Sequence, residues 1–203
     1  MKIIAIGRNY AEHALELNNP VPSEPVIFMK PDTAILRNNH CFYLPDFSTD
    51  IHYEAEIVLR IAREGKHIAE KFAASYISAI SIGIDFTARD VQKKLKEKGL
   101  PWELSKAFDH SAPVGDFIEM TDSAALSEIP FHLLINGIKV QEGNTRDMIF
   151  SFAALISYIS SRITLKSGDL IFTGTPAGVG TVHAGDLLEG FVRDQKLMHI
   201  TVA

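Results

Sequence analysis

Two glutamates one residue apart, inside an otherwise apolar stretch, are the residues of this chain best placed to bind a metal ion. Glu54 and Glu56 lie within residues 51–61, whose β-branched and aromatic side chains predict a strand. Side chains alternate across a strand, so both carboxylates are expected on one face. At about 4 Å, two such charges repel by roughly 4 kcal/mol at an effective dielectric constant of about 20. Either water solvates that face or a cation lies between the carboxylates.

A third carboxylate, Asp85, lies in a second apolar run, residues 77–86, which also predicts a strand. Three carboxylates on strands supply the hard oxygen ligands that magnesium, manganese and calcium ions prefer. The single cysteine and the lack of a His-x-x-x-His pair make zinc a poorer fit. Spacing alone leaves two interpretations open, a divalent-metal site and an exposed strand face whose acids are solvated.

His13 and Glu16 could form a general base and the carboxylate that orients it. They are three residues apart in a helix predicted over residues 9–17, so their side chains can meet. The helix is short and is followed by Asn18-Asn19-Pro20, which suits a mobile lid. Polar pairs at this spacing are common on exposed helix faces, so the pair taken alone is more simply explained as incidental.

Three further side chains could contact a substrate. Arg89 and Gln92 share one face of a helix predicted over residues 88–98, where Arg89 could grip a carboxylate and Gln92 could bind an oxygen. Lys106 lies in an apolar loop with the only tryptophan and could stabilise an enolate or a carboxylate. The alternatives are a solvated helix face and a surface lysine whose stem covers apolar neighbours.

A glycine-rich turn over residues 173–180 follows a short buried strand predicted over residues 170–173. Its glycines permit close backbone approach and a group of N–H donors around an anion. The turn lacks the Gly-Lys-Ser/Thr ending of a phosphate loop, so nucleotide binding is not supported. A tight connection between two strands is the alternative interpretation.

The composition is ordinary for a globular enzyme with one core. Of 203 residues, 46% are hydrophobic and 22% are charged. The net charge of −5, without a basic block, argues against nucleic acid as a partner. The apolar start is too short for a signal peptide, and no apolar run is long enough to span a membrane. With one cysteine and no disulfide framework, the expected location is the cytoplasm.

Strands dominate the elements that must position these side chains. They are predicted over residues 3–6, 26–29, 51–61, 77–86, 170–173 and two segments after 187, with an Asn-Gly hairpin at 133–140. Helices are predicted over residues 9–17, 68–76, 88–98 and 144–162, and Thr87 is expected to be the N-cap of the third. Residues 31–50 and 101–108 are expected to be loops. Strands outnumber helices without regular alternation, which predicts a β-rich α+β fold rather than a doubly wound sheet.

Five segments, taken in order, resemble the signatures of the fumarylacetoacetate hydrolase family and together extend over nearly the whole chain. They are GRNYAEH at residues 7–13, HYEAE at 52–56, DFTARD at 85–90, KAFD at 106–109 and TGTPAGVG at 173–180. The compact length and the sequence GLPW at 99–102 are most similar to the small single-domain branch. That branch contains acylpyruvate hydrolases and oxaloacetate decarboxylases.

The resemblance implies a single catalytic domain over residues 1–203, a mixed β-sandwich roll, a homodimer and Mg²⁺ or Mn²⁺ as cofactor. It implies a catalytic dyad of His13 and Glu16 on a lid over residues 9–20 that orders when substrate binds. Lys106 is implied as a further catalytic residue. The implied metal ligands are Glu54, Glu56 and Asp85, and the implied substrate contacts are Arg89, Gln92, Lys106 and Thr175.

The first functional hypothesis is metal-dependent hydrolysis of a C–C bond in a 3-acylpyruvate, such as fumarylpyruvate or acetylpyruvate. His13, oriented by Glu16, would remove a proton from the attacking water, and pyruvate and a carboxylic acid would be released. The second is decarboxylation of oxaloacetate, in which Lys106 stabilises the enolate. Tautomerisation or isomerisation of a related 2-oxo-dicarboxylic acid is a third. A non-catalytic metal-binding protein is the alternative from a different class.

Overall fold

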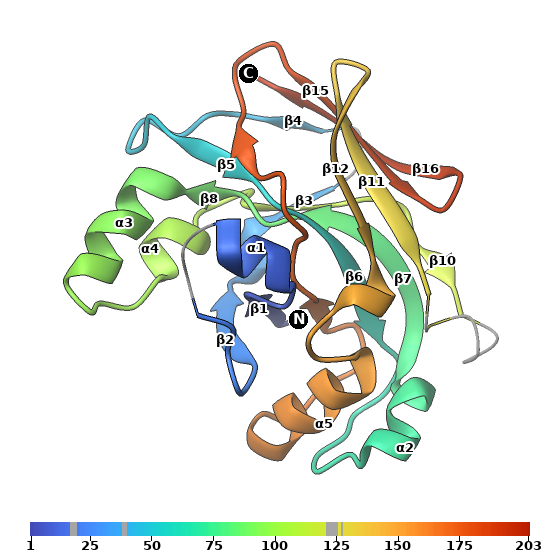
Figure 1. The fold of residues 1–203 in the computed structure, drawn as a ribbon. Helices are drawn as coiled ribbons and strands as arrows, with labels where there is room; N and C mark the ends of the chain where they lie inside the picture. Colours follow the sequence, from blue (N-terminus) through green and yellow to red (C-terminus); the bar gives the residue numbers. More distant parts are fainter. Residues whose placement is uncertain (17–19, 38–39, 121–125, 127) are drawn as a thin grey trace.

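A curved sheet through the middle of the molecule carries the strands of the predicted acidic site (Figure 1). The computed structural model describes residues 1–203 except 17–19, 38–39, 121–125 and 127. Within these residues the sheet has eight strands. Their spatial order is Val26–Lys30 (β2), Ile3–Gly7 (β1), Leu170–Phe172 (β13), Ala55–Ile61 (β6), Ile77–Ile84 (β7), Ala112–Val114 (β9) and Ile35–Arg37 (β3), with Ile118–Glu119 (β10) paired to β7.

Two smaller sheets complete the strand framework of the described residues. One contains, in spatial order, Ile138–Asn144 (β12), Pro130–Ile135 (β11), Leu187–Val192 (β15), Gln195–Val202 (β16) and Cys41–Phe42 (β4). The other contains Gly180–Thr181 (β14), Ile51–Tyr53 (β5) and Thr87–Ala88 (β8). β15 and β16 pack on β7, and β11 packs on β6. The β-rich α+β class predicted from the sequence is therefore confirmed.

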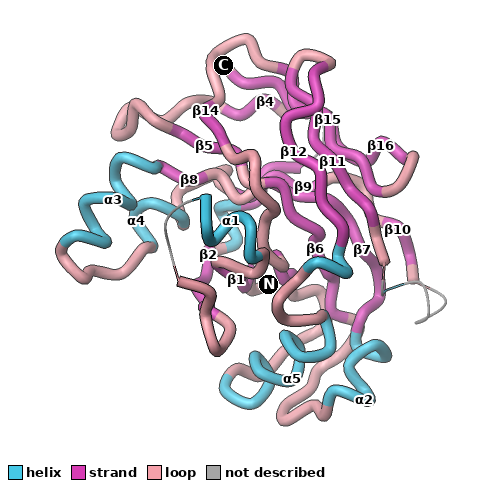
Figure 2. The backbone as a smooth tube through the Cα atoms, in the orientation of Figure 1, coloured by secondary structure: helices cyan, strands magenta, loops and turns pink. Residues whose placement is uncertain are grey.

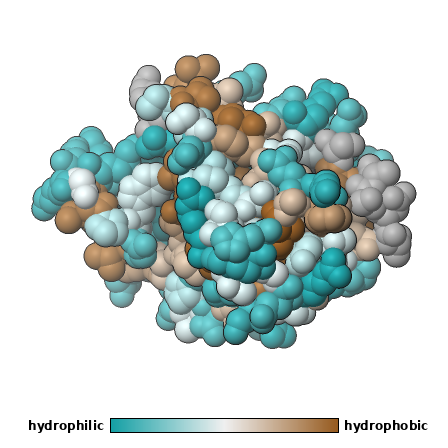
Figure 3. All heavy atoms as spheres, turned by 90° about the horizontal axis from the view of Figure 1, so that it is seen from below, coloured by the Kyte–Doolittle hydropathy of each residue, from teal (hydrophilic) through white to brown (hydrophobic). Residues whose placement is uncertain are grey.

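Helices lie outside the sheets (Figure 2). Ala11–Glu16 (α1) follows β1 in the chain. Glu70–Ala73 (α2) packs with Phe152–Arg162 (α5), and Arg89–Glu97 (α3) packs with Glu103–Lys106 (α4). Among the described residues, no helix has the length and apolar character needed to cross a membrane. The face seen from below is largely hydrophilic, with hydrophobic side chains in scattered groups (Figure 3).

The apolar core lies between the two larger sheets and fixes the position of β6. Ile57 and Leu59 of β6, Ile82 of β7, Leu188 of β15 and Met198 of β16 belong to one cluster and are fully buried. Burial of each such side chain contributes about 1.5–3 kcal/mol. The packing on β6 and β7 thus holds the ends of these strands, where the acids lie, in a fixed relation.

The strand predicted over residues 51–61 is in fact two strands in two sheets, and this is the main correction to the predicted elements. β5 belongs to the three-stranded sheet and β6 to the eight-stranded sheet, with Glu54 at the break between them. The Glu54 carbonyl oxygen accepts a hydrogen bond from the Asp85 backbone N–H at 2.8 Å. This bond ties the break to the residue that follows β7.

Five other predicted features differ in the structure. Residues 31–50 contain the 3₁₀ helix Asp32–Ala34, β3 and β4, and residues 101–108 contain α4. Thr87 belongs to β8 and does not cap α3, because its hydroxyl donates to the Asp85 carbonyl oxygen at 3.2 Å instead. The helix predicted from residue 144 begins at Phe152, after the 3₁₀ helix Thr145–Asp147. The helix predicted over residues 68–76 is split into α2 and the 3₁₀ helix Ala74–Tyr76.

The remaining predicted elements agree closely. β1, β2, β7, β13, β15 and β16 lie where strands are predicted. In the hairpin of β11 and β12, Asn136 has a φ of 53° and Gly137 a φ of 79°, as a type I′ turn requires. α1 agrees with the helix predicted over residues 9–17 from Ala11 to Glu16, whereas Asn9 and Tyr10 are not helical and Leu17 lies outside the described residues.

Asp169 anchors the N-terminus beside β13. It is 1% exposed, accepts hydrogen bonds from the backbone N–H groups of Lys2 (2.8 Å) and Lys166 (2.7 Å), and forms an ion pair with the Lys2 ammonium. Burial raises the pKa of Asp169, but the bonds from Lys2 and Lys166 outweigh it and leave the pKa below its usual value. The carboxylate is therefore stabilising in the folded state.

Asp169→Asn is expected to lower the free energy of unfolding by about 1.5–3 kcal/mol, as measured by urea denaturation at neutral pH. A lowered pKa in the folded state stabilises the protein above the unfolded value and loses this effect as pH falls through the folded value. The difference between wild type and variant should therefore shrink below about pH 4. Asp46→Asn, at an exposed position, is the matched control. Equal stability of the Asp169 variant and the wild type would contradict the expectation.

Candidate metal centre and substrate pocket

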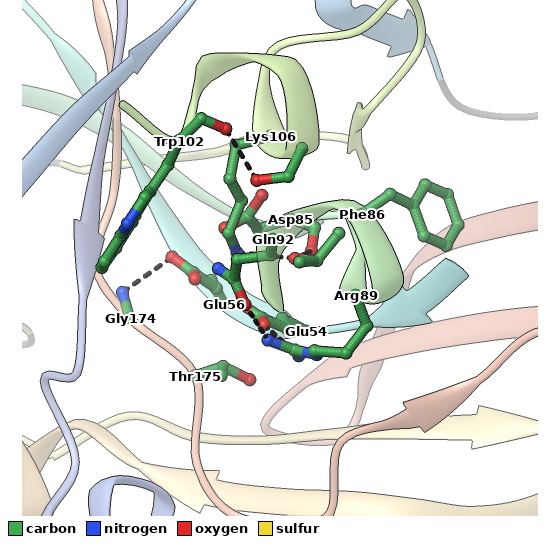
Figure 4. A network of polar contacts seen from close by, with 12 residues as sticks. Glu54, Glu56, Asp85, Phe86, Arg89, Gln92, Trp102, Lys106, Gly174 and Thr175 are labelled. Carbon is green, nitrogen blue, oxygen red and sulfur yellow. Dashed lines mark hydrogen bonds and ion pairs between the residues drawn. The ribbon is translucent and has the colours of Figure 1, made fainter. Parts of the chain in front are cut away.

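Three buried carboxylates converge where β5, β6 and β7 end or begin (Figure 4). Glu54 lies between β5 and β6, Glu56 is the second residue of β6, and Asp85 directly follows β7. One oxygen from each lies within 4.8 Å of the others, and the residues are 5%, 1% and 1% exposed. A solvated strand face, the alternative that the sequence left open, does not describe this cluster.

Three basic side chains surround the carboxylates. Arg89 Nη2 lies 2.6 Å from Glu54 Oε1, and Lys106 Nζ lies 2.8 Å from Glu54 Oε2 and 2.5 Å from Asp85 Oδ2. Lys106 is 3% exposed, so it is not the surface lysine that the sequence left as an alternative. Its third donor reaches Thr87 Oγ1 at 2.6 Å.

Lys30, at the end of β2, is the third basic residue and was missed from the sequence. It is 2% exposed, and its ammonium lies 2.8 Å from Asp85 Oδ1, a close ion pair without the alignment of a hydrogen bond. It donates to the carbonyl oxygens of Lys106 and Ser111. Lys30 therefore holds both an acid of the cluster and the backbone of α4. The one indication of this role in the sequence is that Lys30 ends an apolar strand.

The electrostatics of the cluster favour a divalent cation. Burial would raise the pKa of Glu54, but the charges of Lys106 and Arg89 lower it well below its usual value. Burial raises the pKa of Glu56 well above its usual value, and the charges of Asp85 and Glu54 raise it further. Among the described residues no basic side chain pairs with Glu56, whose Oε2 accepts a hydrogen bond from the Gly174 backbone N–H at 2.7 Å.

The carboxylate donors therefore fit a metal ion chemically. A cation between the three acids would offset the repulsion that disfavours ionised Glu56, and all three offer hard oxygen ligands. The residues that would hold it are those predicted from the sequence: Glu54, Glu56 and Asp85.

His13 and Glu16 on α1 form the pair predicted from their spacing. His13 Nδ1 lies 3.2 Å from Glu16 Oε2, and Glu16 Oε1 accepts a hydrogen bond from the Gly178 backbone N–H at 3.0 Å. His13 is only 4% exposed, so an incidental pair on a helix surface does not describe it. The glycine-rich turn thus contacts the helix through a backbone donor.

One pocket brings most of the predicted site residues together. His13, Glu54, Glu56, Arg89, Gln92, Lys106 and Thr175 line it. Glu16, which is exposed, and Asp85, which is buried, do not line it but contact the lining residues His13 and Lys106. Gln92 Oε1 accepts from Arg89 Nη1 at 2.8 Å, so Arg89 is held between Gln92 and Glu54. The lining also includes residues outside the predicted site: Ile6, Gly7, Arg8, Phe28, Lys96 and Trp102.

The β-rich fold and a pocket that combines acidic, basic and histidine side chains are features of an enzyme that acts on a small molecule. The chain belongs to the fumarylacetoacetate hydrolase family, because residues 2–202 match the family model described as fumarylacetoacetate (FAA) hydrolase C-terminal. The family resemblance noted in the sequence is therefore confirmed.

Relatives within the family have several activities. The chain is 43% identical over 189 residues to a mitochondrial oxaloacetate decarboxylase of Dictyostelium discoideum, covering 93% of this chain and 87% of that protein. It is 42% identical to a mitochondrial oxaloacetate tautomerase of Rattus norvegicus, covering 92% and 85%. The crystal structure of fumarylpyruvate hydrolase from Pseudomonas aeruginosa with Mn²⁺ and pyruvate has a TM-score of 0.95 at 33% identity, covering 100% of this chain and 89% of that one.

Proposed function

We propose that the protein is a divalent-metal-dependent enzyme, using Mg²⁺ or Mn²⁺, that cleaves the C3–C4 bond of 3-acylpyruvates by hydrolysis. The products are pyruvate and a carboxylic acid. The observation that carries the proposal is the buried His13, which contacts the Glu16 carboxylate and lines the same pocket as Glu54 and Glu56, since hydrolysis needs a base for water. A metal ion held by Glu54, Glu56 and Asp85 would supply Lewis-acid polarisation of the 2-oxo acid.

The side chains of the pocket divide the chemistry between them. His13, oriented by Glu16, takes a proton from water, whose oxygen then attacks the C4 carbonyl carbon. The C3–C4 bond breaks, and its electron pair passes into the enolate of pyruvate, which the Lys106 ammonium stabilises. The protonated His13 returns its proton to C3. Arg89, Gln92 and Thr175 hold the oxygen atoms of the substrate.

Oxaloacetate is the second candidate substrate, and the names of two relatives at 42–43% identity favour it. It has the same 2-oxo acid group, and loss of CO₂ leaves the same enolate beside Lys106. No attacking water is needed for this reaction. Tautomerisation of oxaloacetate, or isomerisation of a related 2-oxo-dicarboxylic acid, needs only proton transfer by His13.

A pyruvate-release assay tests the proposal. Acetylpyruvate, fumarylpyruvate and oxaloacetate are offered with Mg²⁺, with Mn²⁺ and with chelator, and the enol absorbance of oxaloacetate is followed separately to detect tautomerisation. We expect metal-dependent pyruvate release from at least one acylpyruvate. Folded, metal-loaded protein that releases no pyruvate from any acylpyruvate would contradict the hydrolase proposal, and release from oxaloacetate alone would favour the second candidate.

Basic side chains at the pocket favour substrates with a second carboxylate. Arg8 has a φ of 61°, uncommon for a residue other than glycine, and its guanidinium lies 5.7 Å from the centre of the Trp102 ring. Lys96 lines the same pocket, where burial lowers its pKa and the charges of Arg8 and Arg89 lower it further. These charges can bind the distal carboxylate of fumarylpyruvate or oxaloacetate, which acetylpyruvate lacks.

Arg8→Met is expected to raise KM for fumarylpyruvate or oxaloacetate by about tenfold, corresponding to roughly 1.4 kcal/mol, because the second carboxylate loses a charged donor. KM for acetylpyruvate should change much less. Steady-state kinetics with the two kinds of substrate measure the difference, and Arg8→Lys, which keeps the charge, is the matched variant. Equal changes for both kinds of substrate would contradict a role for Arg8 in carboxylate recognition.

Several features stay predictions. They are a single catalytic domain over residues 1–203, a lid over residues 9–20, a homodimer and a cytoplasmic location. Part of the proposed lid, residues 17–19, lies outside the described residues. The oxaloacetate decarboxylase and the oxaloacetate tautomerase named above are mitochondrial proteins, so the comparisons do not confirm a cytoplasmic location.

A further inference from the structure

We propose that Gln141 is a positioning residue that makes the Thr175 hydroxyl a hydrogen-bond donor to the oxygen atoms of the bound 2-oxo acid. Gln141 lies on β12, in the five-stranded sheet, and none of the sequence motifs includes it. It is 2% exposed, as is Thr175. The inference rests on the proposed function in one respect, that Thr175 contacts the substrate.

Two backbone groups fix which end of the Gln141 amide is oxygen and which is nitrogen. The Ala55 backbone N–H, which can only donate, donates to Gln141 Oε1 at 2.9 Å. The Pro176 carbonyl oxygen, which can only accept, accepts from Gln141 Nε2 at 3.0 Å. Rotating the amide by 180° would break both bonds and bring like groups together. The orientation of this side chain is thus determined by its partners.

The direction of the Thr175 hydroxyl follows from that orientation. Gln141 Nε2 also donates to Thr175 Oγ1 at 2.9 Å, so Oγ1 is an acceptor on that side. The hydroxyl proton must therefore point elsewhere, and among the described residues no acceptor for it is found. Thr175 lines the same pocket as Glu56 and Lys106. An incoming carboxylate or carbonyl oxygen is the acceptor that this arrangement fits.

Gln141 also joins the metal-binding strand to the glycine-rich turn. Ala55 lies between Glu54 and Glu56, and Thr175 follows Gly174, whose N–H donates to Glu56. On its own sheet, Gln141 pairs with Leu133, directly before an irregularity in register between Leu133 and Leu134. Such bulges change the direction of side chains, here towards the site. One amide thus sets the spacing between the acids and the substrate-facing hydroxyl.

Gln141→Glu tests the proposal with little change in shape. One carboxylate oxygen can still accept from Ala55, but the other has no proton for Pro176 or Thr175, so the Thr175 hydroxyl must turn to donate to it. The variant is combined with Thr175→Val in a double-mutant cycle. The probe is oxalate, a planar analogue of the pyruvate enolate, titrated calorimetrically into Mn²⁺-loaded protein.

We expect Thr175→Val to weaken oxalate binding by about tenfold in the wild-type background and by less than twofold in the Gln141→Glu background. If Thr175→Val weakens oxalate binding by the same factor in both backgrounds, the proposal is overturned, because a Gln141 with only a structural role would not change the effect of the Thr175 substitution. Gln195→Glu, at an exposed position on β16, controls for the added charge. Gln141→Met, which has no hydrogen-bonding amide, provides a second cycle if Gln141→Glu does not fold.

The readout separates this proposal from the proposed function. Coupled effects on oxalate affinity without turnover of any acylpyruvate would support the role of Gln141 and contradict the hydrolase. Turnover of an acylpyruvate, together with independent effects of the two substitutions on oxalate affinity, would support the hydrolase and contradict the role of Gln141. Wild-type protein that binds Mn²⁺ but no oxalate would overturn the proposal, because Thr175 would then have no anion to contact.

Discussion

His13→Ala is expected to lower kcat for acylpyruvate hydrolysis by about 10²–10⁴-fold, because the attacking water loses its base. The imidazole is buried in the pocket, 3.2 Å from the Glu16 carboxylate, and the two carboxylates that line the same pocket, Glu54 and Glu56, belong to the candidate metal centre. Metal-dependent decarboxylation of oxaloacetate should be much less affected, since CO₂ leaves without an attacking water. Parallel kinetics with an acylpyruvate and oxaloacetate measure the contrast.

Glu12→Ala is the matched control for this prediction. Glu12 lies on the same short helix but is exposed and does not line the pocket of His13. We expect the control to retain most of its activity on both substrates. Near-wild-type hydrolysis by the His13 variant would show that the dyad assignment is wrong. Equal losses on both substrates would instead assign His13 to a step common to the two reactions.

Lys106→Met is expected to have two opposite effects. Turnover should fall by about 10²–10³-fold, because the enolate loses a charged donor. Affinity of the metal-free protein for Mn²⁺ should rise, because the Lys106 ammonium lies 2.8 Å from Glu54 and 2.5 Å from Asp85 and competes for the same oxygens. Calorimetric titration with Mn²⁺ and steady-state kinetics on the same preparation measure both.

The exposed pair of Lys139 and Glu142 offers the control for that experiment. Lys139→Met removes a lysine that also contacts a carboxylate at 2.8 Å, but on the surface and away from the pocket. Its Mn²⁺ affinity and turnover should match those of the wild type. An unchanged or weaker Mn²⁺ affinity in the Lys106 variant would contradict competition between the ammonium and the metal.

Local sequence patterns were enough to predict much of the framework and the acid cluster. Alternation and β-branched residues located β6 and β7, and the spacing of Glu54, Glu56 and Asp85 located the carboxylates. The break at Glu54 could not be predicted, because the apolar pattern continues through it. The break depends on a bond to Asp85, 31 residues further along the chain, and on membership of β5 in another sheet.

The residues that support the site could not be predicted from the sequence either, because their contacts also join distant parts of the chain. Lys30 reaches Ser111 across 81 positions, and Gln141 reaches Ala55 across 86. Neither lies within a recognisable motif, and each acts through tertiary packing rather than local spacing. The loop wrongly predicted over residues 31–50 has the same cause, since β3 and β4 are short strands defined by partners far along the chain.

The ion pairs between the acids and three basic side chains have a consequence for the stability of the protein without its metal ion. In small zinc domains the metal site does not exist before the ion binds, so folding is coupled to metal binding. Here Lys30, Arg89 and Lys106 already form ion pairs with Glu54 and Asp85 inside the chain. We therefore expect the protein to keep its fold when a chelator removes the metal ion, and to lose only its activity.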